Sequence, residues 1–222
     1  MTLLPIMNDQ DIPVFNDITQ VHNTLHDRGC RRCDLGFQAN INGCCVSRGT
    51  FDTRKMIIGE APGKEEDARG APFTGPAGKL MDQIWYSAGM NSSDWYISNV
   101  IHCRPVAQKG SGKENLTPKT DQIDKCKVYI ENEIKLLKPE LIVTLGAIAT
   151  STILGIKGMK MGDYRGKLVK AKIAGHSVLV FPMLHPAALL HAKGNKDLYT
   201  TYRLQMWEDA QMLKQKVTEM GI

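Results

Sequence analysis

The sequence predicts an α/β fold of three layers, in which helices cover both faces of a central, mostly parallel sheet of four strands. Short apolar runs of strand length alternate with longer segments in which apolar residues recur at helical spacing. The 222 residues are 42% hydrophobic, which is enough for one domain with a sizeable core. We therefore expect a single domain over residues 1–222, with an irregular arm at about residues 1–20.

Four apolar runs predict the strands of this sheet. They cover residues 55–58, 95–101, 141–145 and 178–181. Between and after them, helices are predicted over residues 75–88, 121–137, 146–154 and 198–217. Two polar segments rich in glycine remain: residues 106–119 predict a flexible loop, and residues 158–175 predict a β-hairpin.

Polar residues stand at or shortly beyond the carboxyl ends of three of the predicted strands. Glu60, Asn99 and His185 stand at these positions, and Gly146 follows the remaining strand. In a parallel sheet covered by helices, ligands bind outside the carboxyl ends of the strands. Taken alone, such an Asn more often caps a turn and such a His is more often structural. Together, they are expected to converge on one ligand site.

Charge and cysteine usage restrict the class of function. The net charge is +5 and the isoelectric point about 8.8, a mild basic bias that is compatible with a polyanionic partner. Because we find neither a secretory signal nor an apolar run of membrane-spanning length, we expect a cytoplasmic location. In a reducing compartment the six cysteines do not predict disulfides. The pair Cys30 and Cys33 instead has the C-x-x-C spacing of metal ligation or redox chemistry.

Residues 59–78 carry the densest motif, between a predicted strand and a predicted helix. Their glycines permit close approach of the backbone to a ligand, and Glu60, Glu66 and Asp67 place carboxylates beside them. A helix cap explains any one of these carboxylates, but it does not explain the whole run. A phosphate-binding loop fits badly, because the G-x-x-x-x-G-K-S/T pattern is missing and acidic side chains repel phosphate.

Taken in order, the motifs resemble those of the family 4 uracil-DNA glycosylases. The shared motifs are GEAPG-x-x-E-D from residue 59, the strand ending in Asn99, Cys103-Arg104-Pro105, Leu145-Gly146-Ala147 and His185-Pro186. The resemblance covers about residues 30–215. It implies a four-stranded parallel sheet between helices and a 4Fe-4S cluster. It also implies that the protein binds uracil-containing DNA, flips the uracil out, and hydrolyses its bond to the sugar to leave an abasic site.

The resemblance also implies roles for the residues of a base pocket. Phe73 would stack on the flipped uracil, Asn99 would read its N3 and O4, and the backbone of Ala61 would contact O2. An Asn side chain suits this role because it offers both a donor and an acceptor, complementary to uracil and opposite to cytosine. Glu66 would crowd the C5 position and exclude the methyl group of thymine.

Catalysis and DNA contact are implied for the remaining positions. His185 would contact O2 of the departing uracil, and Glu60 would place the attacking water or stabilise the sugar cation. Leu189, Leu190 and His191 would form the loop that enters the duplex where the base left. A carboxylate near the sugar and a donor at O2 stabilise the charges that develop as the bond breaks.

The cluster ligands of the family fall on four cysteines that are far apart in the sequence. These ligands would be Cys30, Cys33, Cys103 and Cys126. A four-cysteine zinc site is the alternative, which spacing does not exclude. Adjacent residues rarely both ligate one cluster, so we interpret Cys44 and Cys45 as free thiols, although either is able to replace one of the four ligands.

An inserted stretch, QKGSGKE at residues 108–114, departs from the family pattern. Lys109, Lys113 and Lys119 are predicted to contact the DNA backbone there, with a solvated loop as the alternative. A covalent, DNA-crosslinking relative carries a reactive histidine in an insertion at a similar place, but residues 106–125 contain no histidine. We therefore expect ordinary hydrolysis, and separately we expect the protein to be a monomer. The alternatives are a glycosylase for another modified pyrimidine and a non-catalytic iron–sulfur module that binds DNA.

Overall fold

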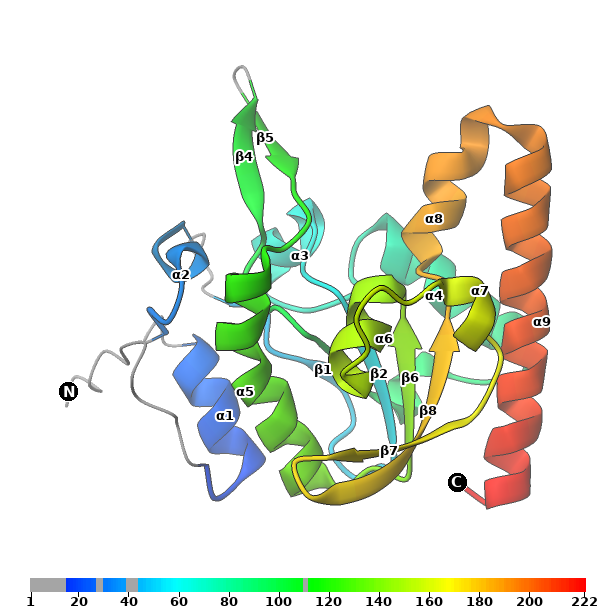
Figure 1. Cartoon of the computed structure of the whole chain (residues 1–222), viewed down its shortest axis with the longest axis horizontal. Coiled ribbons are helices and arrows are strands. Elements are labelled where there is room, and N and C mark those ends of the chain that lie inside the picture. Colours follow the sequence, from blue (N-terminus) through cyan, green and yellow to red (C-terminus); the bar gives the residue numbers. More distant parts are fainter. Residues whose placement is uncertain (1–14, 27–29, 39–43, 110–111) are drawn as a thin grey trace.

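The computed structural model describes residues 15–26, 30–38, 44–109 and 112–222. Within these residues the central sheet has six strands, in the order β1-β3-β2-β6-β8-β7 (Figure 1). The strands are β1 (Arg48–Gly49), β2 (Lys55–Gly59), β3 (Tyr96–Asn99), β6 (Leu141–Leu145), β7 (Val169–Ile173) and β8 (His176–Met183).

The four inner strands are those that the sequence predicts, and they run parallel. The prediction of a four-stranded sheet is nonetheless wrong, because β1 and β7 add an antiparallel strand at each edge. β1 is only two residues long, too short to show a pattern of its own. β7 falls within the predicted hairpin segment 158–175, but its partner is the first part of β8, with Ile173 opposite His176.

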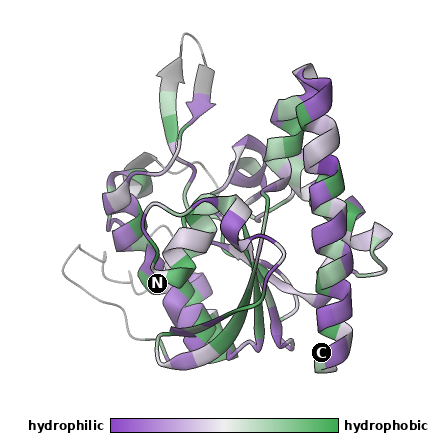
Figure 2. Ribbon diagram, turned by 45° about the vertical axis from the view of Figure 1, so that its right-hand side comes forward, coloured by the Kyte–Doolittle hydropathy of each residue, from purple (hydrophilic) through white to green (hydrophobic). Residues whose placement is uncertain are grey.

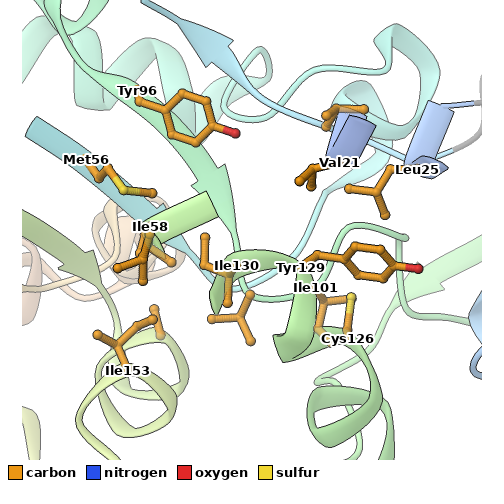
Figure 3. Close-up of a cluster of buried hydrophobic side chains, with 14 of the residues drawn as sticks. Val21, Leu25, Met56, Ile58, Tyr96, Ile101, Cys126, Tyr129, Ile130 and Ile153 are labelled. Atoms are coloured by element: carbon orange, nitrogen blue, oxygen red, sulfur yellow. The ribbon is translucent and has the colours of Figure 1, made fainter. Parts of the chain in front are cut away.

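Helices cover both faces of the sheet, and each face has its own hydrophobic core. The helices of the first face are α1 (Ile18–His26), α5 (Thr120–Leu137) and α6 (Ala147–Leu154). Those of the second are α4 (Pro76–Ser87) and α9 (Lys196–Met220). Side chains alternate along β2, so Met56 and Ile58 join the first core and Ile57 the second. The inner strands of the sheet are predominantly hydrophobic (Figure 2), and the first core contains apolar side chains of α1 and α5 together with Met56 and Ile58 (Figure 3).

The predicted loop over residues 106–119 is largely a hairpin. β4 (Val106–Lys109) pairs antiparallel with β5 (Gly112–Asn115), so the prediction of an irregular loop is wrong for this part. The hairpin and α8 (Pro186–His191) both lie beyond the carboxyl ends of the parallel strands of the main sheet (Figure 1). The remaining short helices are α2 (Asp34–Gln38), α3 (Lys64–Arg69), α7 (Met161–Tyr164) and the 3-10 turns Ser92–Asp94 and Ala192–Gly194.

The direction of winding reverses after β3. From β2 the chain passes through α4 to β3 on one side, and it then returns through α5 to β6 on the other. In sheets of this kind a crevice lies outside the carboxyl ends of the strands at such a reversal. In the part of the chain that the structure describes, no helix is long and apolar enough to cross a bilayer.

Candidate active site

A cleft of about 480 Å³ lies at this crevice. Glu60 after β2, Asn99 at the end of β3 and His185 after β8 all line it, so the three strand-end side chains meet at one site. Gly146, which follows β6, lies against the side chain of His185. The cleft is completed by other residues of the 59–78 run, by the base of the β4–β5 hairpin and by α8: Ala61, Pro62, Gly63, Lys64, Glu65, Glu66, Phe73, Pro76, Ala77, Pro105, Asn115, Leu116, Ala187, Leu190 and His191.

Close packing around Gly59 brings the predicted base reader and the predicted stacking ring together. Gly59 pairs with Asn99 across the β2–β3 ladder. A Cβ added at Gly59 would collide with the Asn99 side-chain oxygen and the Phe73 ring. Because glycine lacks this atom, both side chains converge over the end of β2. Asn99 is only 2% exposed, so its amide faces the protein interior and the cleft rather than bulk water.

The backbone of Phe73 is held in an unusual conformation. Its φ of 54° lies in the left-handed region, which is uncommon for a residue with a side chain. Gly78 in α4 packs directly onto the Phe73 carbonyl, where any Cβ would overlap it. Strain of this kind persists where surrounding packing enforces it and is frequent at ligand sites. The buried Phe73 ring lies 5.8 Å from the His185 ring, centroid to centroid, with the two planes tilted by 32°.

Glu66 is a fixed wall of the cleft. The residue is buried on α3, and its Oε1 accepts a hydrogen bond of 2.8 Å from the backbone N–H of Gly75. Gly75 is the N-cap of α4, where a carboxylate is favoured by the exposed N–H groups and the helix dipole. The carboxylate therefore links α3 to the start of α4, and this contact fixes its position.

The state of the His185 imidazole follows from its place at the start of α8. As N-cap, its Nδ1 accepts a hydrogen bond of 3.1 Å from the backbone N–H of Ala187. Burial lowers the pKa of His185 to about 4. The ring is therefore neutral at physiological pH and, because Nδ1 is the acceptor, its proton is on Nε2. A neutral donor is thus available in the cleft.

Glu60 is the carboxylate closest to the end of β2. Its backbone carbonyl accepts a hydrogen bond of 2.9 Å from the Ile101 N–H, which holds the turn after β2 against the turn after β3. Burial raises the pKa of the Glu60 carboxyl, because the charged form loses hydration. The group is therefore a more basic carboxylate than one on the open surface.

Sequence reasoning missed the contribution of the hairpin to the cleft. Asn115 and Leu116, at the end of β5, both line it. Arg104 is buried and donates from Nε to Asn115 Oδ1 at 2.6 Å, while its Nη1 lies 3.9 Å from Asp67 Oδ2. This contact ties the hairpin base to α3. In the sequence, Asn115 directly follows the inserted stretch, but nothing there indicates that it reaches the cleft. The pairing of β4 with β5 places it there.

The predicted DNA-contacting residues lie in different environments. On α8, Leu190 and the exposed His191 line the cleft, whereas Leu189 is only 4% exposed and packs into the core. Lys119 is exposed at the N-cap of α5, and its Nζ lies 3.6 Å from Asp34 Oδ2. Lys109 and Lys113 belong to the paired strands β4 and β5, but their side chains are outside the described part of the structure.

Five cysteines surround a second, small cavity beside α5. They are the four predicted ligands Cys30, Cys33, Cys103 and Cys126, together with Cys44. Burial raises the pKa of the Cys30, Cys33 and Cys126 thiols, so thiolates at these positions need a positive group to neutralise them. Cys126 and Tyr129 lie side by side at the edge of the first core (Figure 3). Among the described residues no three His, Cys, Asp or Glu side chains have the geometry of a site for a metal ion. The donor set nevertheless has the all-thiolate chemistry that suits a 4Fe-4S cluster.

The chain belongs to the Uracil DNA glycosylase superfamily, whose family model matches residues 46–211. The chain is 37% identical to the type-4 uracil-DNA glycosylase of Saccharolobus solfataricus, over 74% of each chain. It is 33% identical to that of Pyrobaculum aerophilum, over 78% of this chain and 85% of the relative, and 31% identical to that of Archaeoglobus fulgidus, over 77% and 82%. The chain therefore belongs to the type-4 uracil-DNA glycosylases.

Proposed function

We propose that this protein excises uracil from DNA by hydrolysing the N-glycosidic bond, leaving an abasic site for repair. The observation that supports this most strongly is the convergence of Glu60, Asn99 and His185 from three strand ends on one cleft, in a chain of this family. A base inside a duplex cannot reach such a cleft, so the uracil must be flipped out of the stack.

Base recognition is assigned to Phe73 and Asn99. The Phe73 ring offers a flat apolar face for stacking, and the Asn99 amide accepts from N3–H of uracil while donating to O4. Cytosine presents the opposite donor and acceptor at these two positions. The N–H of Ala61 adds a donor toward O2. The Glu66 carboxylate, held by the Gly75 N–H, stands against the C5 position and excludes the thymine methyl group.

Bond cleavage is assigned to His185 and Glu60. As the bond breaks, negative charge develops on the departing uracil and positive charge on the sugar. The neutral His185 donates from Nε2 to O2 of uracil, and the Glu60 carboxylate orients water toward the sugar carbon and stabilises its charge. A single aimed donor in a dry site typically supplies roughly 3 kcal/mol, about a hundredfold in rate. Water adds to the sugar, and the uracil leaves with the proton.

The DNA contacts are assigned to both sides of the cleft. On one side Leu190 and His191 would enter the duplex where the base has left, with Leu189 supporting them from the core. On the other side the β4–β5 hairpin, with Lys109 and Lys113, and the nearby Lys119 would meet phosphates.

We also propose that Cys30, Cys33, Cys103 and Cys126 hold a 4Fe-4S cluster. When bound, it would act as a cross-link between the N-terminal segment, the turn after β3 and α5, and it would supply the charge that keeps the four thiolates ionised. A monomeric state, a cytoplasmic location and a single domain over residues 1–222 stay predictions.

The decisive experiment is a strand-cleavage assay on oligonucleotides that carry one uracil. The expected result is an alkali-labile abasic site at uracil, with none at thymine or 5-substituted pyrimidines. Glu60→Gln should lose about a hundredfold in rate, whereas Asp52→Asn, on an exposed loop, serves as the matched control. Excision only at modified bases, or binding without excision, would assign the protein to another function. A denaturant-resistant protein–DNA complex would contradict hydrolysis.

A further inference from the structure

The cysteine cavity contains one thiol more than a cluster with four cysteine ligands uses. Cys44, in the segment before β1, lines it together with the four proposed ligands. Its neighbour Cys45 does not: the Cys45 thiol points away and donates to the Glu66 carbonyl at 3.0 Å. The two adjacent cysteines therefore differ in environment, and only Cys44 is available to the cavity.

Cys44 is closest to one particular ligand. Its Sγ lies 2.8 Å from Cys103 Sγ, and both side chains are buried, at 3% and 7% exposure. We propose that Cys44 is a reserve ligand, able to take the place of Cys103 at the iron–sulfur site. This inference rests on the iron–sulfur cofactor proposed above.

Hydrogen bonds that do not involve either sulfur hold the segments of Cys44 and Cys103 side by side. The Cys45 N–H donates to the His102 carbonyl at 2.8 Å, and His102 Nδ1 donates to the Cys45 carbonyl at 2.9 Å. This double contact joins the segment before β1 to the turn after β3 one residue away from each sulfur. His102 is fully buried, so the contact is shielded from water. Exchange between the two thiols therefore needs side-chain rotation only.

The exchange is balanced without any redox partner. On becoming a ligand the Cys44 thiol would release a proton, and on ceasing to be one the Cys103 sulfur would take up a proton. One thiolate leaves for each that binds, so the number of ligands and the charge of the site stay the same.

The test measures iron, sulfide and broad visible absorption in anaerobically purified full-length protein. The variants are Cys103→Ala, Cys44→Ala/Cys103→Ala and the matched control Cys45→Ala/Cys103→Ala; alanine is chosen because a serine oxygen can itself ligate. We expect Cys103→Ala and the control to retain the cluster, and the Cys44→Ala/Cys103→Ala protein to lose it. Equal loss from all three proteins would overturn the inference. Zinc in place of iron in the unmodified protein would instead reject the cofactor itself.

A second measurement decides the matter if Cys103→Ala does not fold. Cys44→Ala and Cys45→Ala both keep the four proposed ligands, so both should load with iron. In air, the cluster of Cys44→Ala should decay faster, because no reserve thiol recaptures the iron when Cys103 dissociates. Equal half-lives would overturn the inference. A Cys44–Cys103 disulfide in iron-loaded protein would do the same, since a sulfur in a disulfide is not a thiolate ligand.

Discussion

At the scale of single residues, Asn99 carries the discrimination between uracil and cytosine. We predict that Asn99→Asp lowers kcat/KM on uracil by about tenfold to a hundredfold, because a carboxylate accepts from N3–H but cannot donate to O4. The estimate takes roughly 1–3 kcal/mol for a bidentate base contact. The control is Asn91→Asp, where Oδ1 accepts from the Ser93 N–H on the surface and an Asp retains that bond. Unchanged kinetics in a folded Asn99→Asp protein would remove Asn99 from the pocket.

His185 gives a prediction about pH. Because burial lowers its pKa to about 4, the ring stays neutral in the folded protein well below the ordinary value of 6.5. The unfolded chain takes up this proton first, so His185 makes folding stability fall as the pH drops from 6.5 towards 4. An NMR titration of the His185 ring nitrogens should show no protonation at pH 6 and a midpoint near 4. A midpoint near 6.5 would mean that His185 is a cation in mildly acidic solution.

At the scale of elements, the β4–β5 hairpin carries the stretch that departs from the family pattern and also lines the cleft with Asn115. We predict that alanine at Lys109, Lys113 and Lys119 weakens DNA binding and flattens its salt dependence by up to about one unit of slope per lysine. Catalysis on fully bound substrate should change little, because the β4–β5 ladder is made by backbone groups and Lys119, the one of the three whose side chain is described, does not line the cleft.

The matched control for these lysines is on another edge strand. Lys170 and Lys172 lie on β7 and are exposed, so Lys170→Ala/Lys172→Ala removes surface charge away from the cleft. Its salt slope should equal that of the unmodified protein, measured by fluorescence anisotropy. If the hairpin variant behaves like this control, the hairpin does not contact phosphates.

At the scale of the whole molecule, α5 lines the cysteine cavity with Cys126, packs into the first core with Ile130, and carries a buried acid, Glu133. Glu133 is fully buried, and neither carboxylate oxygen is at hydrogen-bond geometry to a described group. Burial raises its pKa to about 8. The folded protein therefore keeps this proton between pH 4.5 and 8 while the unfolded chain loses it, and stability falls as the pH rises through this range.

We predict that Glu133→Gln removes this loss. The free energy of unfolding should be measured by urea denaturation at pH 6.5 and pH 8. Between these two values it should fall by roughly 2 kcal/mol more in the unmodified protein than in the variant, because one proton contributes a little over 1 kcal/mol per pH unit. Other groups that titrate in this range are present in both proteins, so their effects on stability cancel when the two losses are compared. Equal losses would indicate that Glu133 is already ionised in the folded state.

The sequence by itself determined the inner sheet and the positions around the cleft. A parallel strand buried on both faces shows as a continuous apolar run, which is why residues 141–145 were predicted with the bounds of β6. Since carboxyl ends of parallel strands share one edge, Glu60, Asn99 and His185 were expected to meet before any contact was known. Their chemical roles came from the order of the motifs, and these roles stay predictions.

Only the tertiary structure decided the features that depend on pairing between distant segments. The two-residue β1 exists because β3 offers it a partner, and β5 returns Asn115 to the cleft because β4 does. Burial separated Leu189 from Leu190, and side-chain direction separated Cys44 from Cys45, although each pair is adjacent in the chain. Local patterns specify which face of an element is buried, but the identity of the partner across that face is set by the packing of the whole chain.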